Sequence, residues 1–227
     1  MELNEQGYTL GGVNLIDVAD AHGAPVYVYD ASQIVSNYHE LKDAFKGVDV
    51  QIKYACKALT NINVLKLLKN EGSGLDTVSI EEAKLGLKAG FEPQDILFTP
   101  NSVSFEEIKE AVDLGLIINI DELNILEQFG DTYGNSVPCC IRLNPHILAG
   151  GNSHISVGHI DSKFGISIYQ VPHIKRIMDN YGIHINGLHM HTGSDILDAD
   201  VFLRGANLLY EAAKSFPDLE FLDFGSG

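Results

Sequence analysis

The chain of 227 residues has no tryptophan and only three cysteines, Cys56, Cys139 and Cys140. Two of the three are adjacent, which excludes a regular disulfide framework and favours reduced thiols. Basic residues are also scarce, because 15 Lys and Arg stand against 31 Asp and Glu, for a formal net charge of -16. Such a chain repels nucleic-acid phosphates and anionic membrane surfaces, so we expect no nucleic acid and no membrane among its partners.

Long apolar runs are missing as well. No apolar span is long enough to cross a bilayer, and the acidic residues 1–5 are not followed by the apolar stretch of a signal peptide. We therefore expect a soluble, cytoplasmic protein. What the chain does contain is 45% hydrophobic residues, which is enough for one large core.

From residue 52 onward, short apolar strands alternate with amphipathic helices, at roughly 22 residues per strand and helix. Near-continuous apolar strands separated by single helices indicate a parallel sheet covered by helices. The regular repeat favours an α/β fold of the (βα)8 TIM-barrel type. We expect strands at 52–58, 74–79, 96–99, 117–120, 138–143, 185–191 and 219–224. We expect helices at 32–45, 64–68, 81–89, 105–114, 122–129, 171–178 and 201–212.

This pattern has about seven strands, whereas a closed barrel of the type has eight. A missing strand would leave two sheet edges with unpaired backbone groups. We therefore expect residues 31–227 to form a barrel that is incomplete at its C-terminus, in an N-terminal fragment of a longer protein. Residues 1–30, with short strands expected at 8–10 and 26–29, form a separate N-terminal segment.

Local signals mark several helix starts and one long loop. Ser32 is a plausible N-cap, and Ser79 with Glu82 and Ser104 with Glu107 have the spacing of a capping box. The loop at 145–166 follows the fifth expected strand. Because active sites of such barrels are built from the loops after the strands, this loop is a functional candidate.

Lys57 lies at the end of the expected strand 52–58, where an ammonium either reaches water at the rim or is held for chemistry. A desolvated lysine has a lowered pKa, and its free amine attacks carbonyl groups. The alternative is an ordinary solvated lysine, which is the commoner case for this residue type.

His189 and His191 are two positions apart on an expected strand, so both imidazoles face the same side. One interpretation is a metal site of the kind found in barrel hydrolases. Another places a flat imidazole against an aromatic cofactor, with Ser194 donating a hydrogen bond to the cofactor's phosphate. A third interpretation makes one or both histidines satisfied core residues, above all His189, which lies deeper in the strand.

Two further charged side chains interrupt apolar strands. Asp76 needs a partner such as Lys57 or Arg142, because an unpaired buried carboxylate is costly. Arg142 stays charged and must likewise find acceptors on a carboxylate or a ligand. Glu82 has a structural role in the capping box and is also a candidate for the site.

Small residues follow the last expected strand at Gly225, Ser226 and Gly227. They would let backbone N–H groups approach an anion closely, and late loops of barrels often bind phosphate. Taken alone, this segment is also compatible with a simple turn. Lys163, in the long loop, is more typical of a solvated lysine.

Together and in this order, the segments 54–58, 74–79, 142–145, 162–165, 189–194 and 223–227 resemble the barrel domain of the pyridoxal-phosphate-dependent decarboxylases. This family includes the ornithine, arginine and diaminopimelate decarboxylases, and the resemblance runs from about residue 25 to the end. Within the family, the segments 144–145, 154–158 and 161–165 look most like the diaminopimelate branch.

The resemblance implies that Lys57 holds pyridoxal 5'-phosphate as a Schiff base and that His191 stacks on the pyridine ring. Ser194 and the loop 225–227 would bind the phosphate. Asp76, Glu82 and Arg142 match family positions around the lysine and the ring. Ser226 departs from the three glycines that are usual in this loop, and its hydroxyl could either narrow the approach of the backbone or donate to the phosphate.

The activity implied is decarboxylation of meso-2,6-diaminopimelate to L-lysine and CO2 by a homodimer, with an amino acid as the small-molecule substrate. The alternative is a pyridoxal-phosphate-dependent decarboxylase of another basic amino acid or polyamine precursor, such as ornithine, arginine or carboxynorspermidine. The family's later motifs lie beyond residue 227 in a second, β-rich domain, against which residues 1–30 would pack, so the fragment alone is expected to be inactive. A metal-dependent barrel hydrolase using His189 and His191 and a non-catalytic carrier of pyridoxal phosphate remain the rival functions.

Overall fold

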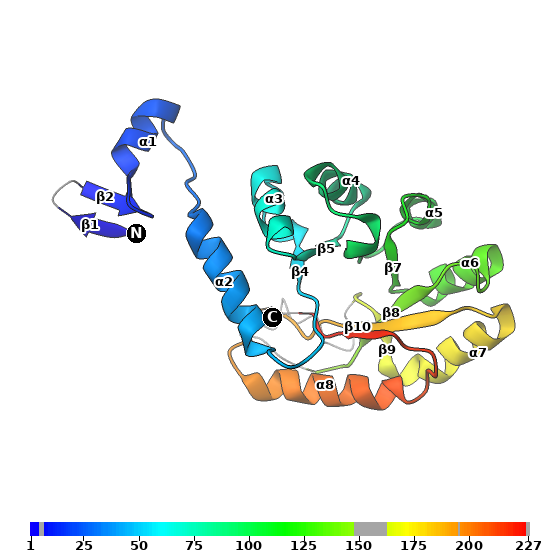
Figure 1. Cartoon of the computed structure of the whole chain (residues 1–227). Coiled ribbons are helices and arrows are strands. Elements are labelled where there is room, and N and C mark those ends of the chain that lie inside the picture. The colour runs from blue at the N-terminus through cyan, green and yellow to red at the C-terminus, as the bar shows by residue number, and fades with distance from the viewer. Residues whose placement is uncertain (5–6, 148–162, 195, 226–227) are drawn as a thin grey trace.

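The computed structural model describes residues 1–4, 7–147, 163–194 and 196–225. They form a curved main body and a small N-terminal unit that projects from it, joined by an irregular segment and helix α2 (Ala31–Ala44) (Figure 1). Most of the loop expected at 145–166 lies outside the described residues. Within the described ranges, no helix has both the length and the hydrophobicity needed to cross a bilayer.

Seven parallel strands form the sheet of the main body, in the order β11, β10, β8, β7, β6, β5, β4. The short strand β9 lies off this path and pairs with the end of β8. The curled sheet is an incomplete barrel, which confirms both the α/β barrel fold and the expected seven strands. The bounds are β4 (Lys53–Ala55), β5 (Gly74–Thr77), β6 (Ile96–Phe98), β7 (Ile117–Ile120), β8 (Cys139–Asn144), β9 (Ile166–Ser167), β10 (Ile185–Met190) and β11 (Phe221–Asp223).

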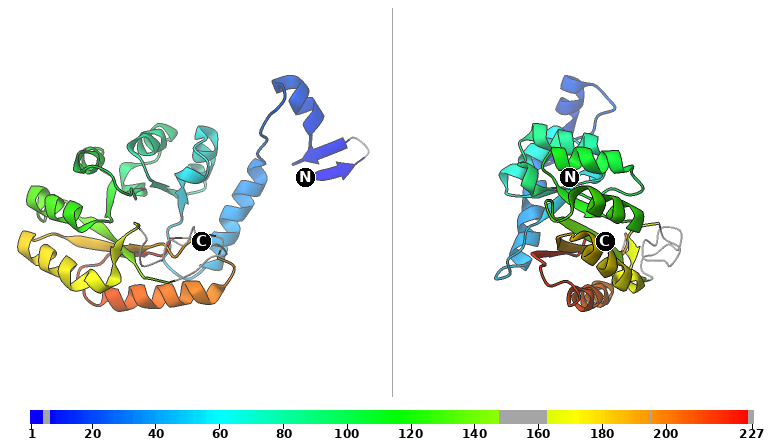
Figure 2. Two further views of the ribbon diagram at one scale, coloured as in Figure 1. Left: turned by 180° about the vertical axis from the view of Figure 1, so that it is seen from behind. Right: turned by 90° about the vertical axis from the view of Figure 1, so that its right-hand side faces the viewer.

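Helices cover the convex outer face of this sheet, as the views from the front and from behind show (Figures 1 and 2). They connect successive strands, as in the right-handed crossovers of parallel sheets. The helices are α3 (Ile62–Asn70), α4 (Ile80–Ala89), α5 (Phe105–Asp113), α6 (Leu123–Tyr133), α7 (Val171–Tyr181) and α8 (Ala199–Ala213). Short 3-10 turns lie at η1 (Cys56–Ala58), η2 (Pro93–Asp95) and η4 (Ile168–Gln170).

Side-chain caps determine where several helices begin. The predicted capping box of Ser104 and Glu107 is present at the start of α5. In α4, Ser79 accepts from the Glu82 N–H as predicted, but the Glu82 carboxylate accepts from Val78 N rather than from Ser79 N. The predicted N-cap Ser32 is wrong. Asp30, two residues earlier, caps α2, because its carboxylate accepts from the N–H groups of Ser32 and Gln33 at the first turn.

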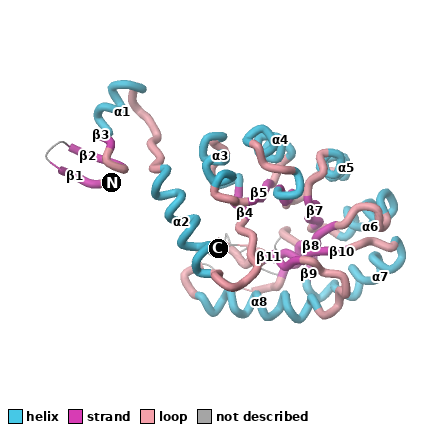
Figure 3. The backbone as a smooth tube through the Cα atoms, viewed as in Figure 1, coloured by secondary structure: helices cyan, strands magenta, loops and turns pink. Residues whose placement is uncertain are grey.

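One predicted strand is shorter than expected, and another is absent. The strand expected at 52–58 ends at Ala55, and the chain turns into η1, which contains Lys57. Residues 26–29 form no strand and are exposed in the connection between α1 (Leu15–His22) and α2, drawn as loop in Figure 3. Their alternating apolar residues have no neighbouring strand among the described residues with which to pair.

The small N-terminal unit is a three-stranded sheet of β1 (Glu2–Asn4), β2 (Gly7–Leu10) and β3 (Val13–Asn14), followed by α1. The strand predicted at 8–10 is confirmed as part of β2. The side chains of α1 are nowhere fully buried. This unit therefore contributes little to the hydrophobic core of the main body.

The two faces of the main sheet differ in polarity, because successive side chains of a strand point to opposite faces. On the outer face, Leu75, Phe98, Ile118 and Ile141 are fully buried beneath the helices. The inner face carries many polar residues, and the buried ones include Thr99, Asn119, Arg142 and His189.

Candidate active site

The polar side chains of the inner face gather where the strands end. Asp76 lies on β5, Asn119 on β7 and Arg142 on β8. On the remaining strands, His189 of β10 is aligned with both Arg142 and Asp223 of β11. Because the carboxyl ends of parallel strands share one rim, these groups form a single constellation at the open end of the barrel.

Lys57 stands at this rim, in the turn η1 directly after β4. Its side chain is exposed, so the structure places it in water at the rim rather than in the apolar environment of a strand interior. The amine is nevertheless close to the constellation, because its positive charge lowers the pKa of Asp76. Lys57 is thus a reachable amine beside a carboxylate.

Asp76 is the carboxylate most perturbed by its surroundings. Burial raises its pKa from 3.8 to about 6, and the nearby charge of Asp223 acts in the same direction. A hydrogen bond with Thr99 and the positive charges of Lys57 and Arg142 oppose this rise. The predicted partners of Asp76 are therefore both present in its electrostatic environment.

Arg142 is buried and is surrounded by carboxylates. Burial lowers its pKa, while the negative charges of Asp121, Asp76 and Asp223 raise it. The guanidinium carbon lies 4.9 Å from the ring centroid of Phe164, a cation–π arrangement. These contacts provide the anionic neighbours that the sequence predicted for a guanidinium within a strand.

His191 follows β10 and is half-buried at the rim. Its pKa is lowered from 6.5 to about 4, mainly by burial and also by the positive charges of Arg142 and Lys57, against the opposing charge of Asp223. The imidazole is therefore neutral at pH 7 and presents a flat, uncharged ring.

Gly225 lies directly beside this ring. A Cβ atom at position 225 would stand 2.6 Å from the carbonyl oxygen of Met190 and 3.1 Å from His191 Nδ1, and the glycine has a φ of +61°. Both the space and the backbone angle therefore require glycine. Its N–H donates to Asp223 Oδ1 at 2.8 Å.

The other predicted site residues have different outcomes. Ser194 is exposed, three residues after His191 in the segment that follows β10. Ser226 and Gly227 lie outside the described residues. Glu82 is half-buried in its capping role, accepting from Val78 N at 2.9 Å. Lys163 is exposed, with its ammonium 5.1 Å from the Phe164 ring centroid.

His189 is turned into the core of the constellation. It is 5% exposed, and its Nδ1 lies 2.8 Å from Asn119 Nδ2. Burial lowers its pKa to about 4. This environment is that of a satisfied core histidine. In the part of the chain that the structure describes, no group of three or more His, Cys, Asp or Glu residues is arranged to hold a metal ion.

Several interior residues were not identified from the sequence. Asn119, Thr99, Asp121 and Asp223 are polar residues within or directly after apolar strands, which is the same signal that singled out Asp76. Lys53, on β4, is a further buried cation whose ammonium donates to the carbonyl oxygen of Asp95 at 2.9 Å. The alternation of each strand would have placed all of them on the inner face.

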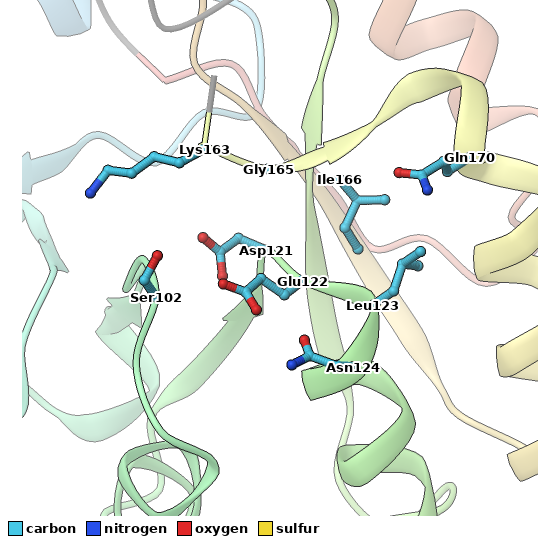
Figure 4. Close-up of a pocket in the computed structure, with 9 residues that line it drawn as sticks. All are labelled: Ser102, Asp121, Glu122, Leu123, Asn124, Lys163, Gly165, Ile166 and Gln170. Atoms are coloured by element: carbon cyan, nitrogen blue, oxygen red, sulfur yellow. The ribbon is translucent and has the colours of Figure 1, made fainter. Parts of the chain in front are cut away.

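A separate cavity of about 460 Å³ lies near the rim, between the segment after β6, the start of α6 and the segment around β9 (Figure 4). The carboxylates of Asp121 and Glu122 face it, but Lys57 and His191 do not line it. Its lining residues are Ser102, Asp121, Glu122, Leu123, Asn124, Lys163, Gly165, Ile166 and Gln170.

Fold and constellation together define a barrel with a reachable lysine at its rim. Residues 31–227 match the family model described as "Pyridoxal-dependent decarboxylase, pyridoxal binding domain", so the chain belongs to the pyridoxal-dependent decarboxylase family. This confirms the family that the sequence motifs indicated.

Several relatives that are similar along the whole chain are diaminopimelate decarboxylases. The diaminopimelate decarboxylase of Methanothermobacter thermautotrophicus is 37% identical over 100% of this chain and 55% of its own length. That of Staphylococcus aureus is 34% identical over 100% of this chain and 56% of its own. The crystal structure of the Helicobacter pylori enzyme complexed with L-lysine superposes with a TM-score of 0.87 at 32% identity, over 94% of this chain and 57% of that one. The chain thus spans about half the length of the curated relatives it matches.

Proposed function

We propose that the chain forms the pyridoxal-phosphate-binding part of a diaminopimelate decarboxylase, which converts meso-2,6-diaminopimelate to L-lysine and CO2. The observation that carries the proposal is similarity along the whole chain to enzymes of that name, one of them solved with L-lysine. The constellation around Lys57 supports it independently, because an amine, a neutral imidazole and a glycine cradle meet at one rim.

The residues present fit the cofactor. Lys57 offers an exposed amine for the aldehyde, and the uncharged ring of His191 offers a flat surface for a pyridine ring. Gly225 brings backbone close to His191 without a Cβ, as phosphate binding requires, and Ser194 offers a hydroxyl nearby. Ser226 and Gly227 would extend this cradle. When bound, pyridoxal phosphate supplies an electron sink that lets the substrate's α-carboxylate leave as CO2.

Asp76 and Arg142 would set the electrostatics of this site. The positive charge of Lys57 opposes the rise of the Asp76 pKa, and above pH 6 Asp76 is mainly ionised. The buried Arg142 offsets part of the negative charge of Asp76, Asp121 and Asp223. Glu82 positions the start of α4 behind Asp76 through its backbone hydrogen bond.

The remaining features of the protein follow from the same assignment. We propose that residues 1–30 pack against a second, β-rich domain, in line with the exposed apolar side chains of Leu3, Tyr8, Val13 and Ile16. We further propose a cytoplasmic homodimer. Size measurement of the intact protein in solution tests the dimer, and a monomeric active enzyme would contradict it.

The amine assignment is tested with the intact protein and two matched variants, Lys57→Ala and Lys66→Ala, the second removing an exposed lysine of α3. With pyridoxal phosphate, the parent protein and Lys66→Ala should show the visible absorbance of the lysine-bound cofactor and retain it covalently after borohydride reduction. Lys57→Ala should do neither. Retention of the covalent cofactor by Lys57→Ala would refute the role of this lysine.

The substrate is tested by CO2 release from meso-diaminopimelate, ornithine, arginine and carboxynorspermidine under identical conditions. Diaminopimelate should give the highest kcat/KM. A preference for another of these compounds would contradict the assignment to the diaminopimelate decarboxylases and would leave the assignment of the cofactor unchanged. Residues 1–227 alone should show no turnover.

A further inference from the structure

A line of hydrogen bonds crosses the inner face of the sheet and ends on His189. Asn119 Nδ2 lies 2.8 Å from His189 Nδ1 and 3.5 Å from Thr99 Oγ1, the longest link. The Thr99 side chain in turn makes a hydrogen bond with the Asp76 carboxylate. Thr99, Asn119 and His189 are 6%, 1% and 5% exposed, so water does not replace these contacts. We refer to these four residues as the interior line.

The number of protons available along the interior line determines which group donates and which accepts in each hydrogen bond. An ionised Asp76 only accepts, so the single hydroxyl proton of Thr99 is donated to it. Thr99 Oγ1 can then only accept from Asn119. The edge of Asn119 that faces Thr99 and His189 is therefore its NH2 group, in agreement with the placement of Nδ2 there.

The same count determines the state of His189. Its Nδ1 accepts a hydrogen bond from Asn119, so a neutral ring carries its own proton on Nε2. The ring is neutral because it is buried and because Arg142, His191 and Lys57 disfavour its protonation, against the opposing charge of Asp223. Nε2–H is then the one donor that this imidazole offers to the rest of the site.

We propose that Asn119 is a positioning residue, which holds His189 as the neutral Nε2–H tautomer one pleat below His191. Asp76 takes part in this positioning through the interior line. While Thr99 donates to the carboxylate, the amide of Asn119 cannot rotate to exchange its NH2 group and its oxygen. The tautomer stands on this geometry alone, whereas its effect on turnover rests on the proposed function.

The tautomer is measured by nitrogen-15 NMR of the intact protein labelled at histidine, because protonated and unprotonated ring nitrogens have well separated shifts. The His189 signals are identified by their loss in His189→Gln. The inference expects a protonated Nε2 and an unprotonated Nδ1 at pH 7.5. A protonated Nδ1 in the parent protein would overturn it.

A matched pair of threonine variants separates the interior line from general packing. Thr99→Val removes the hydroxyl that orients Asn119, and we expect a second, Nδ1–H form of His189 to appear. Thr77→Val is the control, since Thr77 is equally buried but donates to the carbonyl oxygen of Leu97. Identical His189 spectra in the two variants would overturn the inference.

Asn119→Asp reverses the direction of the hydrogen bond with His189, because a carboxylate at position 119 can only accept from Nδ1–H. We expect the His189 tautomer to change and kcat to fall about tenfold with little change in KM, as expected for the loss of one positioning hydrogen bond. An unchanged tautomer, or a changed tautomer with unchanged kcat, would contradict the positioning role. An inactive parent protein with the expected spectra would refute the proposed function and leave the tautomer assignment standing.

Discussion

The two faces of the parallel sheet obey different rules, although their residues alternate along the same strands. Leu75 and Ile141 face the helices and are fully buried among apolar neighbours. Asp76 and Arg142, the next residues in the chain, face the interior, where their charges perturb one another. The outer face therefore stabilises the barrel, whereas the buried charges of the inner face lower its stability and make a charged, reactive interior possible.

The largest effect is expected on the outer face. Phe98→Ala should lower the free energy of unfolding by about 3–5 kcal/mol, because it leaves a cavity beneath the helices. Chemical denaturation with an unchanged m-value checks this. Phe98→Leu, which retains most of the volume, is the control and should cost clearly less. Equal losses for the two variants would show that the site collapses around the cavity.

On the inner face, a substitution that removes a charge should raise the free energy of unfolding instead of lowering it. Asp76 has a pKa of about 6 in the folded protein against 3.8 as its ordinary value, so the folded state binds more protons between these pH values. Its contribution to stability is therefore present below about pH 4 and is lost as the pH rises through 6. Asp76→Asn should thus raise stability at pH 7.5, by about 2–3 kcal/mol, and abolish turnover.

His189 and His191 should change the stability with pH in the opposite direction to Asp76, which provides a check. His189 and His191 have pKa values lowered from 6.5 to about 4, so the unfolded state binds more protons in that window and stability falls as the pH drops through it. In the parent protein Asp76 offsets part of this loss. Denaturation at pH 4.5, 6 and 7.5 should therefore show a steeper acid loss in Asp76→Asn. Parallel pH profiles would contradict the assignment of the raised pKa to Asp76.

A smaller effect is expected from replacing glycines that have a positive φ. Two such glycines separate the cost of backbone strain from the cost of placing a Cβ atom against neighbouring residues. Gly225→Ala and Gly182→Ala both force a positive φ on alanine, at a cost of about 1–2 kcal/mol. Only position 225 also places a Cβ against Met190 and His191, whereas position 182 has no atom within 4 Å. Gly225→Ala should therefore lose affinity for pyridoxal phosphate in a titration, while Gly182→Ala should keep it. Equal affinities would remove Gly225 from the proposed phosphate cradle.

The smallest effect is expected in the outer helical layer. Ser104→Ala removes one half of the capping box of α5 and should lower thermal stability by about 1 kcal/mol. Because α5 lies on the outer face, cofactor binding should not change. A loss of pyridoxal phosphate affinity in this variant would show that the two faces are coupled.

The fold was largely predictable because its signals are local. Apolar strand segments, helical periodicity and the box of Ser104 and Glu107 each act within a few residues, and all three are confirmed. The errors also have local causes. The strand expected at 52–58 ends early because the chain turns into η1 at Cys56, and a β-like sequence at 26–29 stays irregular without a strand to pair with.

The candidate site was predictable in part. Lys57, His191, Asp76, Arg142 and Gly225 were singled out as unusual residues at strand ends, and the structure brings them to one rim. Asn119, Asp121 and Asp223 were missed, because a single polar residue in a strand does not reveal which distant strand it faces. Roles that depend on such neighbours need the register between strands, which no local pattern encodes.

By itself, the sequence determined the alternation of strands and helices and the family of the chain, and it singled out Lys57 as a candidate for the reactive amine. Hydrophobic periodicity and motif chemistry are properties of the chain itself, which is why they can be read without coordinates. Only the tertiary structure decided that Lys57 is exposed, that Asp76 holds its proton up to about pH 6, and that Asn119 faces His189. These properties arise from burial and from charges that strand pairing brings together from distant parts of the chain, and so they exist only in the folded barrel.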